Sequence, residues 1–133
     1  MSRIELAKYR LDRAKEILIE SKDSLKKGYY KLSTNRSYYA MFSATKALLA
    51  LKELDSSRHS GVISLFNRYI IKTGLFPKEL SKLLPKAKDI REDADYGDFV
   101  EISKLDAENQ LKSAEKFVNQ ATKTMSEMIA GKY

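Results

Sequence analysis

Two short polar strings hold the residues with the most useful chemistry in this chain. The first, Arg91 to Tyr96, reads REDADY and sets one guanidinium among several carboxylates. The second contains His59, the single histidine of the 133 residues, directly after Arg58. A guanidinium binds phosphate, and an imidazole can give or take a proton near neutral pH. These strings are therefore candidates for phosphate binding or proton transfer.

Each string also has a structural interpretation. REDADY could form an intramolecular ion-pair network that closes one end of a helical bundle, or a functional rim at a dimer groove. His59 lies at a predicted helix start, where it could act as a local cap or packing group. The functional alternative is proton transfer or phosphate binding, since helix N-termini bind anions and Arg58 is adjacent. A serine triad is not supported, because Ser60 beside it points elsewhere on a helix.

Several tyrosines could stack on nucleobases, because every base presents a flat π-face to an aromatic ring. These are Tyr29, Tyr30, Tyr38, Tyr39 and Tyr96. For the adjacent pair Tyr38 and Tyr39 we favour packing inside a bundle, with the hydroxyl groups finding partners at its edge.

Composition excludes other site chemistries. The chain has no cysteine and one histidine, so a metal site would have to rely on carboxylates. The acidic segment contains Asp89, Glu92, Asp93, Asp95, Asp98 and Glu101. It lacks the glycine placement and terminal glutamate of a calcium loop, and the scattered glycines form no phosphate-cradling fingerprint. We therefore expect no metal and no cofactor.

The net charge of +7 is uneven along the chain. One basic cluster, opposed only by Asp23, consists of Lys22, Lys26, Lys27, Lys31 and Arg36. Such runs are often solvated helix faces. The alternative is a basic surface that meets phosphate or an acidic partner.

The positioning elements are predicted to be helices organised around Asn35–Leu51, with residues 29–34 either a connection or the frayed first turn of this helix. The Asn35–Leu51 stretch is apolar on most sides, with a narrow polar strip through Arg36, Ser43 and Lys46. A helix that is apolar on most sides must be packed on most sides. It should contact several neighbours, or a second copy of the chain. Because it carries more apolar surface than a lone four-helix bundle easily covers, we expect a dimer.

Apolar periodicity places the other helices before and after this element. The first should run from about residue 3 to 27, and the last from a cap at Ser103 and Asp106 to about residue 129. Between them a helix should start near residue 57 and stop at Gly74. A further helix, from Pro77, should be kinked or split at Pro85. Residues 93–101 should be irregular.

The fold class is therefore all-α: an up-and-down antiparallel bundle of four main helices plus a short or proline-broken helix, forming one domain over residues 1–133. The first and last helices, with matching heptad seams, should lie side by side. No apolar run is long enough to span a membrane and no signal segment opens the chain, so we expect a cytoplasmic protein without membrane association.

Four segments together resemble the HEPN domain family of small prokaryotic proteins: NRSYYAMFSATKALL, RHSGVISLF, KTGLFPKELSKLL and IREDADYGDF. The resemblance covers nearly the whole chain. It implies a helical bundle that usually forms a homodimer and associates with nucleotides or RNA. It also implies that a minimal nucleotidyltransferase could be the partner in a two-component, toxin–antitoxin-like pair.

Active members of that family are metal-independent endoribonucleases. They use an arginine followed, after four to six residues, by a histidine and often a tyrosine at the dimer cleft. Arg91 and Tyr96 match the arginine and tyrosine, but no histidine follows Arg91, and Asp95 lies near the expected place. An ionised aspartate repels phosphate and does not replace imidazole. His59 could substitute if the fold brings it to Arg91.

We therefore favour a nucleotide- or RNA-binding module. Its candidate binding residues are Asn35, Arg36, Tyr39, Arg58, His59, Arg91, Asp95 and Tyr96. The alternative is a metal-independent ribonuclease that uses Arg91 with His59, and with Tyr96 as a third catalytic candidate. A second alternative is a purely structural helical protein whose charges only confer solubility.

Overall fold

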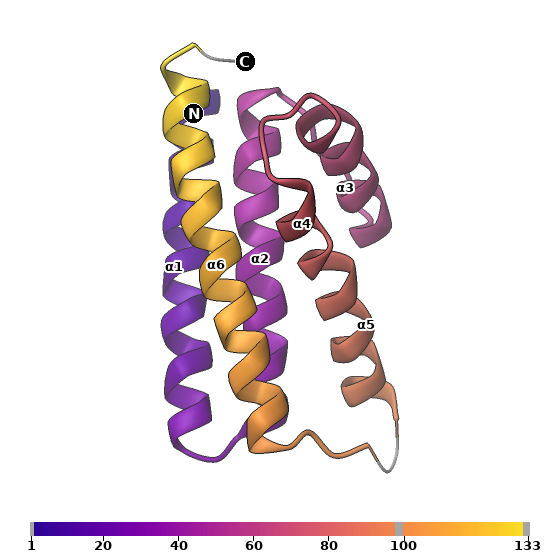
Figure 1. Cartoon of the computed structure of the whole chain (residues 1–133). Helices are drawn as coiled ribbons and strands as arrows, with labels where there is room; N and C mark the ends of the chain where they lie inside the picture. The colour runs from indigo at the N-terminus through magenta and orange to yellow at the C-terminus, as the bar shows by residue number, and fades with distance from the viewer. Residues whose placement is uncertain (1, 98–99, 132–133) are drawn as a thin grey trace.

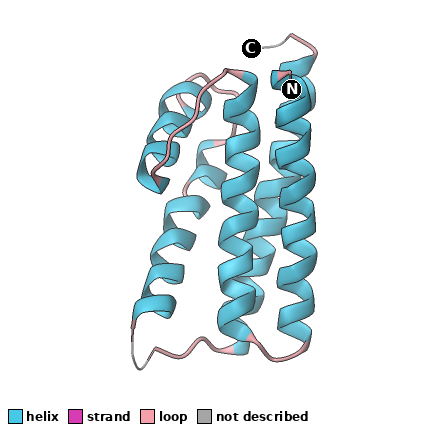
Figure 2. Ribbon diagram, turned by 180° about the vertical axis from the view of Figure 1, so that it is seen from behind, coloured by secondary structure: helices cyan, strands magenta, loops and turns pink. Residues whose placement is uncertain are grey.

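The computed structural model describes residues 2–97 and 100–131, and these form helices joined by short connections, with no strand in the described ranges. Three long helices, α1 (Arg3–Lys26), α2 (Tyr30–Leu51) and α6 (Lys104–Ile129), pack against one another. A layer of shorter segments covers the other side of α2 (Figure 1; Figure 2 shows the reverse view). In chain order these are α3 (His59–Phe66), η1 (Asn67–Ile71), α4 (Lys78–Ser81) and α5 (Leu83–Tyr96). The predicted all-α bundle is confirmed.

The central position of α2 follows from its composition. It contacts α1, α3, α5 and α6, which together cover its apolar sides. Tyr38, Met41 and Leu48 are fully buried within this single chain. The physical argument for a dimer, that a lone bundle could not cover this helix, is therefore wrong: the protomer covers it alone.

Small polar side chains let α1 and α2 approach closely. The Ser21 hydroxyl donates to the Ser33 carbonyl oxygen at 2.8 Å and lies 2.8 Å from the Ser37 hydroxyl, all of them buried. These contacts also explain why α2 begins at Tyr30 rather than at Asn35: its first turns are buried through hydrogen bonds rather than apolar side chains. Gly28, at φ +80°, supplies the left-handed residue that ends α1.

The outer long helices begin with side-chain caps. The Ser2 hydroxyl accepts from the backbone N–H of Glu5. Ser103 and Asp106 form a complete capping box at the start of α6, as their spacing predicts. The predicted adjacency of the first and last helices is confirmed, because α1 and α6 pack together.

The third helix is not regular throughout. After α3 the backbone widens into the π-helical segment η1, and Gly74, at φ +81°, turns the chain back. The glycine at position 61, near the start of α3, is explained by a steric restriction, since a Cβ atom there would collide with the Ser56 side chain. The close neighbour is thus a serine side chain in the preceding loop.

The predicted break at the second proline occurs, but not at Pro85 itself. The helical path divides at Lys82, between α4 and α5, which places Pro85 in the first turn of α5. A proline is tolerated there because the N–H it lacks would have no intrahelical acceptor. The expectation of irregular structure over residues 93–101 is wrong for 93–96, where α5 continues to Tyr96, and is confirmed at Gly97 and residues 100–101. Residues 98–99 lie outside the described ranges. No helix in the described ranges has the length and apolarity needed to cross a bilayer.

Candidate functional site

Two adjacent tyrosines of α2 form the base of the candidate site. Tyr38 is fully buried and Tyr39 half-buried, with their rings edge-to-face at a centroid distance of 5.0 Å. Burial raises the pKa of the Tyr38 hydroxyl, so this residue stays a neutral phenol. The expected packing role of the pair is confirmed, and both hydroxyl groups have polar partners.

His59, the first residue of α3, packs against these rings. Its Nδ1 lies 2.8 Å from the Tyr38 hydroxyl oxygen. The imidazole and Phe42 ring centroids are 4.3 Å apart. Burial lowers the pKa of His59, and the positive charges of Arg91 and Lys88 lower it further. The ring is therefore neutral at physiological pH.

The hydrogen bond to Tyr38 fixes which imidazole nitrogen carries the proton. We assign the donor role to the tyrosine, because no other acceptor for its buried hydroxyl hydrogen lies in the described part of the chain. Nδ1 of His59 then accepts, and Nε2 carries the N–H. The imidazole therefore presents a hydrogen-bond donor to a ligand.

Arg91 of α5 reaches the same two tyrosines. Nη1 donates to the Tyr39 hydroxyl at 3.2 Å and to Asp95 Oδ2 at 3.4 Å. The guanidinium carbon lies 5.1 Å from the Tyr38 ring centroid and 5.4 Å from that of Tyr39. Its Nε is buried and has no acceptor within the described residues. Such unpaired donors are rare in native proteins.

The entrance of the site is formed by Asn35 and Arg36. The Arg36 guanidinium donates from Nη2 to Asn35 Oδ1 at 2.7 Å and pairs with Glu20 at 3.3 Å. It also lies 5.3 Å from the Tyr39 ring centroid. The ring of Tyr39 thus contacts two guanidinium groups, from α2 and α5.

Each cation that contacts the tyrosine pair has a carboxylate partner. Arg91 pairs with Asp95 and, at 3.8 Å, with Glu92. Lys88 pairs with Glu92 at 2.9 Å, and this hydrogen bond, together with the charge of Arg91, lowers the pKa of Glu92. The cluster is therefore close to electrically balanced, unlike a simple phosphate-binding pocket.

The structure brings together six of the predicted site residues: Asn35, Arg36, Tyr39, His59, Arg91 and Asp95. We call these, with Tyr38, the His59–Arg91 cluster. Two predicted residues are not part of it. Tyr96 is 78% exposed, and the exposed Arg58 side chain makes no ion pair within the described residues.

Sequence reasoning missed several contributors. It did not identify Phe42 or Lys88, and it named Tyr38 and Glu92 without linking either of them to His59. A signal was present for Phe42, which lies four residues after Tyr38 and so on the same side of α2. No signal could link Lys88 or Glu92 to a histidine on another helix. Within the described ranges no group of three or more His, Cys, Asp or Glu side chains could hold a metal ion.

Comparison with known proteins matches this chain to one family. The HEPN domain profile matches residues 7–124. A UPF0332 protein of Thermotoga maritima is 36% identical over 93% of this chain and 94% of its own length. The protein named "Putative toxin MJ0142" of Methanocaldococcus jannaschii is 34% identical over 85% of this chain and 77% of its own length.

A second relative in the same archaeon has a similar name. "Putative toxin MJ0605" is 33% identical over 95% of this chain and 88% of its own length. Among solved structures, ST0689, described as an archaeal HEPN homologue, superposes with a TM-score of 0.70. The superposition covers 94% of this chain and 99% of that chain at 19% sequence identity, which shows a similarity of fold alone.

Proposed function

The chain belongs to the HEPN domain family, and we propose that it is an RNA-binding module whose recognition site is the His59–Arg91 cluster. One observation carries the proposal. His59 and Arg91, from helices on either side of a chain reversal, both contact the adjacent tyrosines of α2. Packing of a purely structural bundle does not require the single histidine of the chain and a buried arginine to contact the same pair of aromatic rings.

The groups that the cluster offers suit an unstacked nucleotide. The half-buried Tyr39 ring, with the Arg36 guanidinium over it, offers a mixed aromatic and guanidinium surface to a base. The Nε2–H of His59 can donate to a base or ribose oxygen. Because the cations of the cluster are already paired, we infer recognition of base and ribose rather than of phosphate alone.

The alternative function is metal-independent RNA cleavage by Arg91 with His59. One observation favours it: the lowered pKa keeps His59 neutral, which a general base requires. The Tyr38 hydrogen bond opposes it, because Nδ1 is occupied and Nε2 already carries a proton. The carboxylates of Glu92 and Asp95 beside Arg91 would also repel the scissile phosphate. We therefore prefer binding without cleavage.

The names of two relatives support a place in a two-component, toxin–antitoxin-like system. We propose a minimal nucleotidyltransferase as the partner protein and a homodimer as the assembly. Exposed apolar side chains on α1, Tyr9 and Ile19, each 62% exposed, are available to an interface. Co-purification with the product of a neighbouring nucleotidyltransferase gene tests the partner, and sedimentation at micromolar concentration tests the dimer.

The experiment that tests RNA binding uses a fluorescently labelled single-stranded RNA in EDTA. Anisotropy should show saturable binding that His59→Ala and Tyr39→Ala each weaken about tenfold, as loss of one stacking or hydrogen-bonding group predicts. The RNA should be recovered intact. Degradation that both His59→Ala and Arg91→Ala abolish would replace binding with the ribonuclease alternative. An absence of binding and cleavage would leave the structural interpretation.

A further inference from the structure

Basic side chains gather in the first part of the layer of short helices, before the acidic residues Asp89, Glu92, Asp93 and Asp95 of α5. Residues 58–88 contain seven lysines and arginines but only one acidic residue, Glu79, whereas the whole chain has a net charge of +7. The basic residues are Arg58, Arg68, Lys72, Lys78, Lys82, Lys86 and Lys88. This segregation differs from the basic cluster at the α1–α2 turn, which the sequence pattern alone emphasised.

These cations are not used for folding. All except Lys88 are exposed, and only Lys88 forms an ion pair within the described residues. On the long helices Arg10, Arg13 and Arg36 each pair with a carboxylate, whereas lysines such as Lys15, Lys26 and Lys112 form no ion pair within the described residues. An unpaired, exposed cation keeps its counterions, and these are released when a phosphate takes their place.

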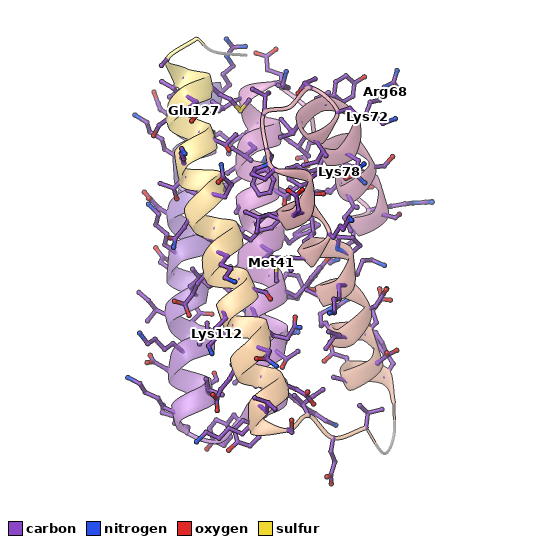
Figure 3. All side chains as sticks on the ribbon, in the orientation of Figure 1. Met41, Arg68, Lys72, Lys78, Lys112 and Glu127 are labelled. Carbon is purple, nitrogen blue, oxygen red and sulfur yellow. The ribbon has the colours of Figure 1, made fainter. Side chains whose placement is uncertain are left out.

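The fold spreads these cations along the layer, from η1 through α4 to the first turns of α5. Segments η1 and α4 are in contact, so Arg68, Lys72 and Lys78 share one end of the layer (Figure 3). Lys82 and Lys86 follow Lys78 at intervals of four residues along α4 and α5. Lys88, whose charge acts on His59, and Arg58, which precedes His59 in the chain, lie beside the His59–Arg91 cluster, whereas Lys86 lines a hollow with residues of α6. We call residues 58–88 of this layer the basic strip.

We propose that the basic strip is a docking surface for the phosphate backbone of single-stranded RNA, which it delivers to the His59–Arg91 cluster. This inference rests on the proposed function and deepens it. It explains how a charge-balanced cluster could belong to an RNA-binding protein: recognition and electrostatic attraction reside on separate surfaces. Phosphate contacts supply affinity, and the cluster supplies selectivity.

The composition of the strip favours a nucleic acid over an acidic protein. The large apolar side chains that the described structure exposes are Ile4, Tyr9, Ile19, Tyr29, Leu32, Tyr96, Leu105 and Ile129. None belongs to residues 58–88. Protein interfaces depend on buried apolar or aromatic anchors, whereas a phosphate backbone is bound by charge alone. A surface with charge and no anchor therefore fits RNA.

The test removes equal charge from two places. One variant combines Lys78→Gln, Lys82→Gln and Lys86→Gln in the basic strip. The matched control combines Lys26→Gln, Lys27→Gln and Lys112→Gln, which are exposed and line a hollow of about 610 Å³ at the far end of the bundle. Thermal melts first establish that both variants are folded. Anisotropy with labelled single-stranded RNA is then measured from about 50 to 200 mM salt.

Each phosphate contact contributes about 0.7 to the slope of log affinity against log salt for a single strand. We expect the strip variant to lose about 2 from this slope and at least tenfold in affinity at low salt, with the control changing about threefold or less. Equal losses in both variants, or no loss in the strip variant, would overturn the docking surface. Polyglutamate competing as strongly as RNA would also overturn it, in favour of an acidic protein.

Failure of this inference and failure of the proposed function give different results. If wild-type protein binds RNA and His59→Ala weakens it while the strip variant does not, only the docking surface is wrong. If wild-type protein binds no RNA, both proposals are wrong.

Discussion

The Tyr38 hydroxyl oxygen lies 2.8 Å from Nδ1 of His59, and this contact joins the hydrophobic core to the candidate site. Tyr38 is fully buried in α2, while His59 begins α3. Because the phenol donates, Nδ1 of the imidazole accepts, and the proton of the neutral ring is on Nε2. The contact therefore couples the stability of the core to the orientation of the imidazole.

Tyr38→Phe should lower the free energy of unfolding by about 1 to 2 kcal/mol, because the ring contacts remain but Nδ1 of His59 loses its donor. Urea denaturation measures the change. Tyr96→Phe is the control, since that hydroxyl is on a side chain 78% exposed and should change stability by about 0.5 kcal/mol or less. Equal stability of Tyr38→Phe and wild type would show that the hydrogen bond contributes nothing.

Stability should fall as the pH drops from 7.5 to 5.5. Burial, Arg91 and Lys88 hold the pKa of folded His59 below its unfolded value of 6.5, while Glu92 acts in the opposite sense. The unfolded chain therefore binds the proton first, and protonation below about pH 6.5 favours unfolding. Carboxylates such as Glu92, with its own lowered pKa, titrate at lower pH.

His59→Gln should remove this pH dependence between 7.5 and 5.5. Urea denaturation of both proteins at the two pH values measures it. A variant that loses as much stability as wild type over this interval would assign the effect to other groups.

Arg91→Ala should destabilise the fold by about 2 kcal/mol. It leaves the Tyr39 hydroxyl and the Asp95 carboxylate without their cation, and the guanidinium is largely shielded from water, with a side chain 11% exposed. Arg68→Ala is the matched control, because Arg68 is exposed and contacts only the ring of its neighbour Tyr69 among the described aromatic residues. Equal melting temperatures of the two variants would refute the claim that Arg91 stabilises the packing of α5 against α2.

Gly61→Ala should destabilise by about 1 kcal/mol although alanine has the higher helix propensity, because its Cβ would overlap Ser56. In a Ser56→Gly background the same substitution should be neutral or stabilising by up to about 1 kcal/mol. The double-mutant cycle therefore predicts coupling of at least about 1 kcal/mol. Additive effects would mean that another contact requires this glycine.

The sequence predicted the helices wherever apolar periodicity was strong. The boundaries of α1 and α6 matched closely because serine caps define them. The start of α2 was left open between a connection and a first helical turn over residues 29–34, and the structure shows the helical turn. The apolar pattern could not decide, because Ser33 and Ser37 are buried by hydrogen bonding to Ser21. The break near Pro85 was predicted in kind but not in place, since a proline fits the first turn of a new helix.

The site was predictable residue by residue but not as a cluster. Residue chemistry identified His59, Arg91 and Tyr39, whereas their convergence depends on where the chain reverses at Gly74 and on the direction of α5. The sequence predicted a polar partner for the Tyr38 hydroxyl at the edge of the bundle, but not that this partner is His59. A tyrosine in an apolar run looks like core, and only the fold shows where its hydroxyl points.

The central claim, that His59 contacts RNA as a hydrogen-bond donor, can be tested on one NMR signal. The chain has a single histidine, so the imidazole resonances of ¹⁵N-labelled, untagged protein need no assignment by mutation. Titration with single-stranded RNA in EDTA should shift the Nε2–H signal saturably while the tautomer is retained and the RNA stays intact. An imidazole spectrum unchanged at saturating RNA, or a proton on Nδ1 rather than Nε2, would contradict the account.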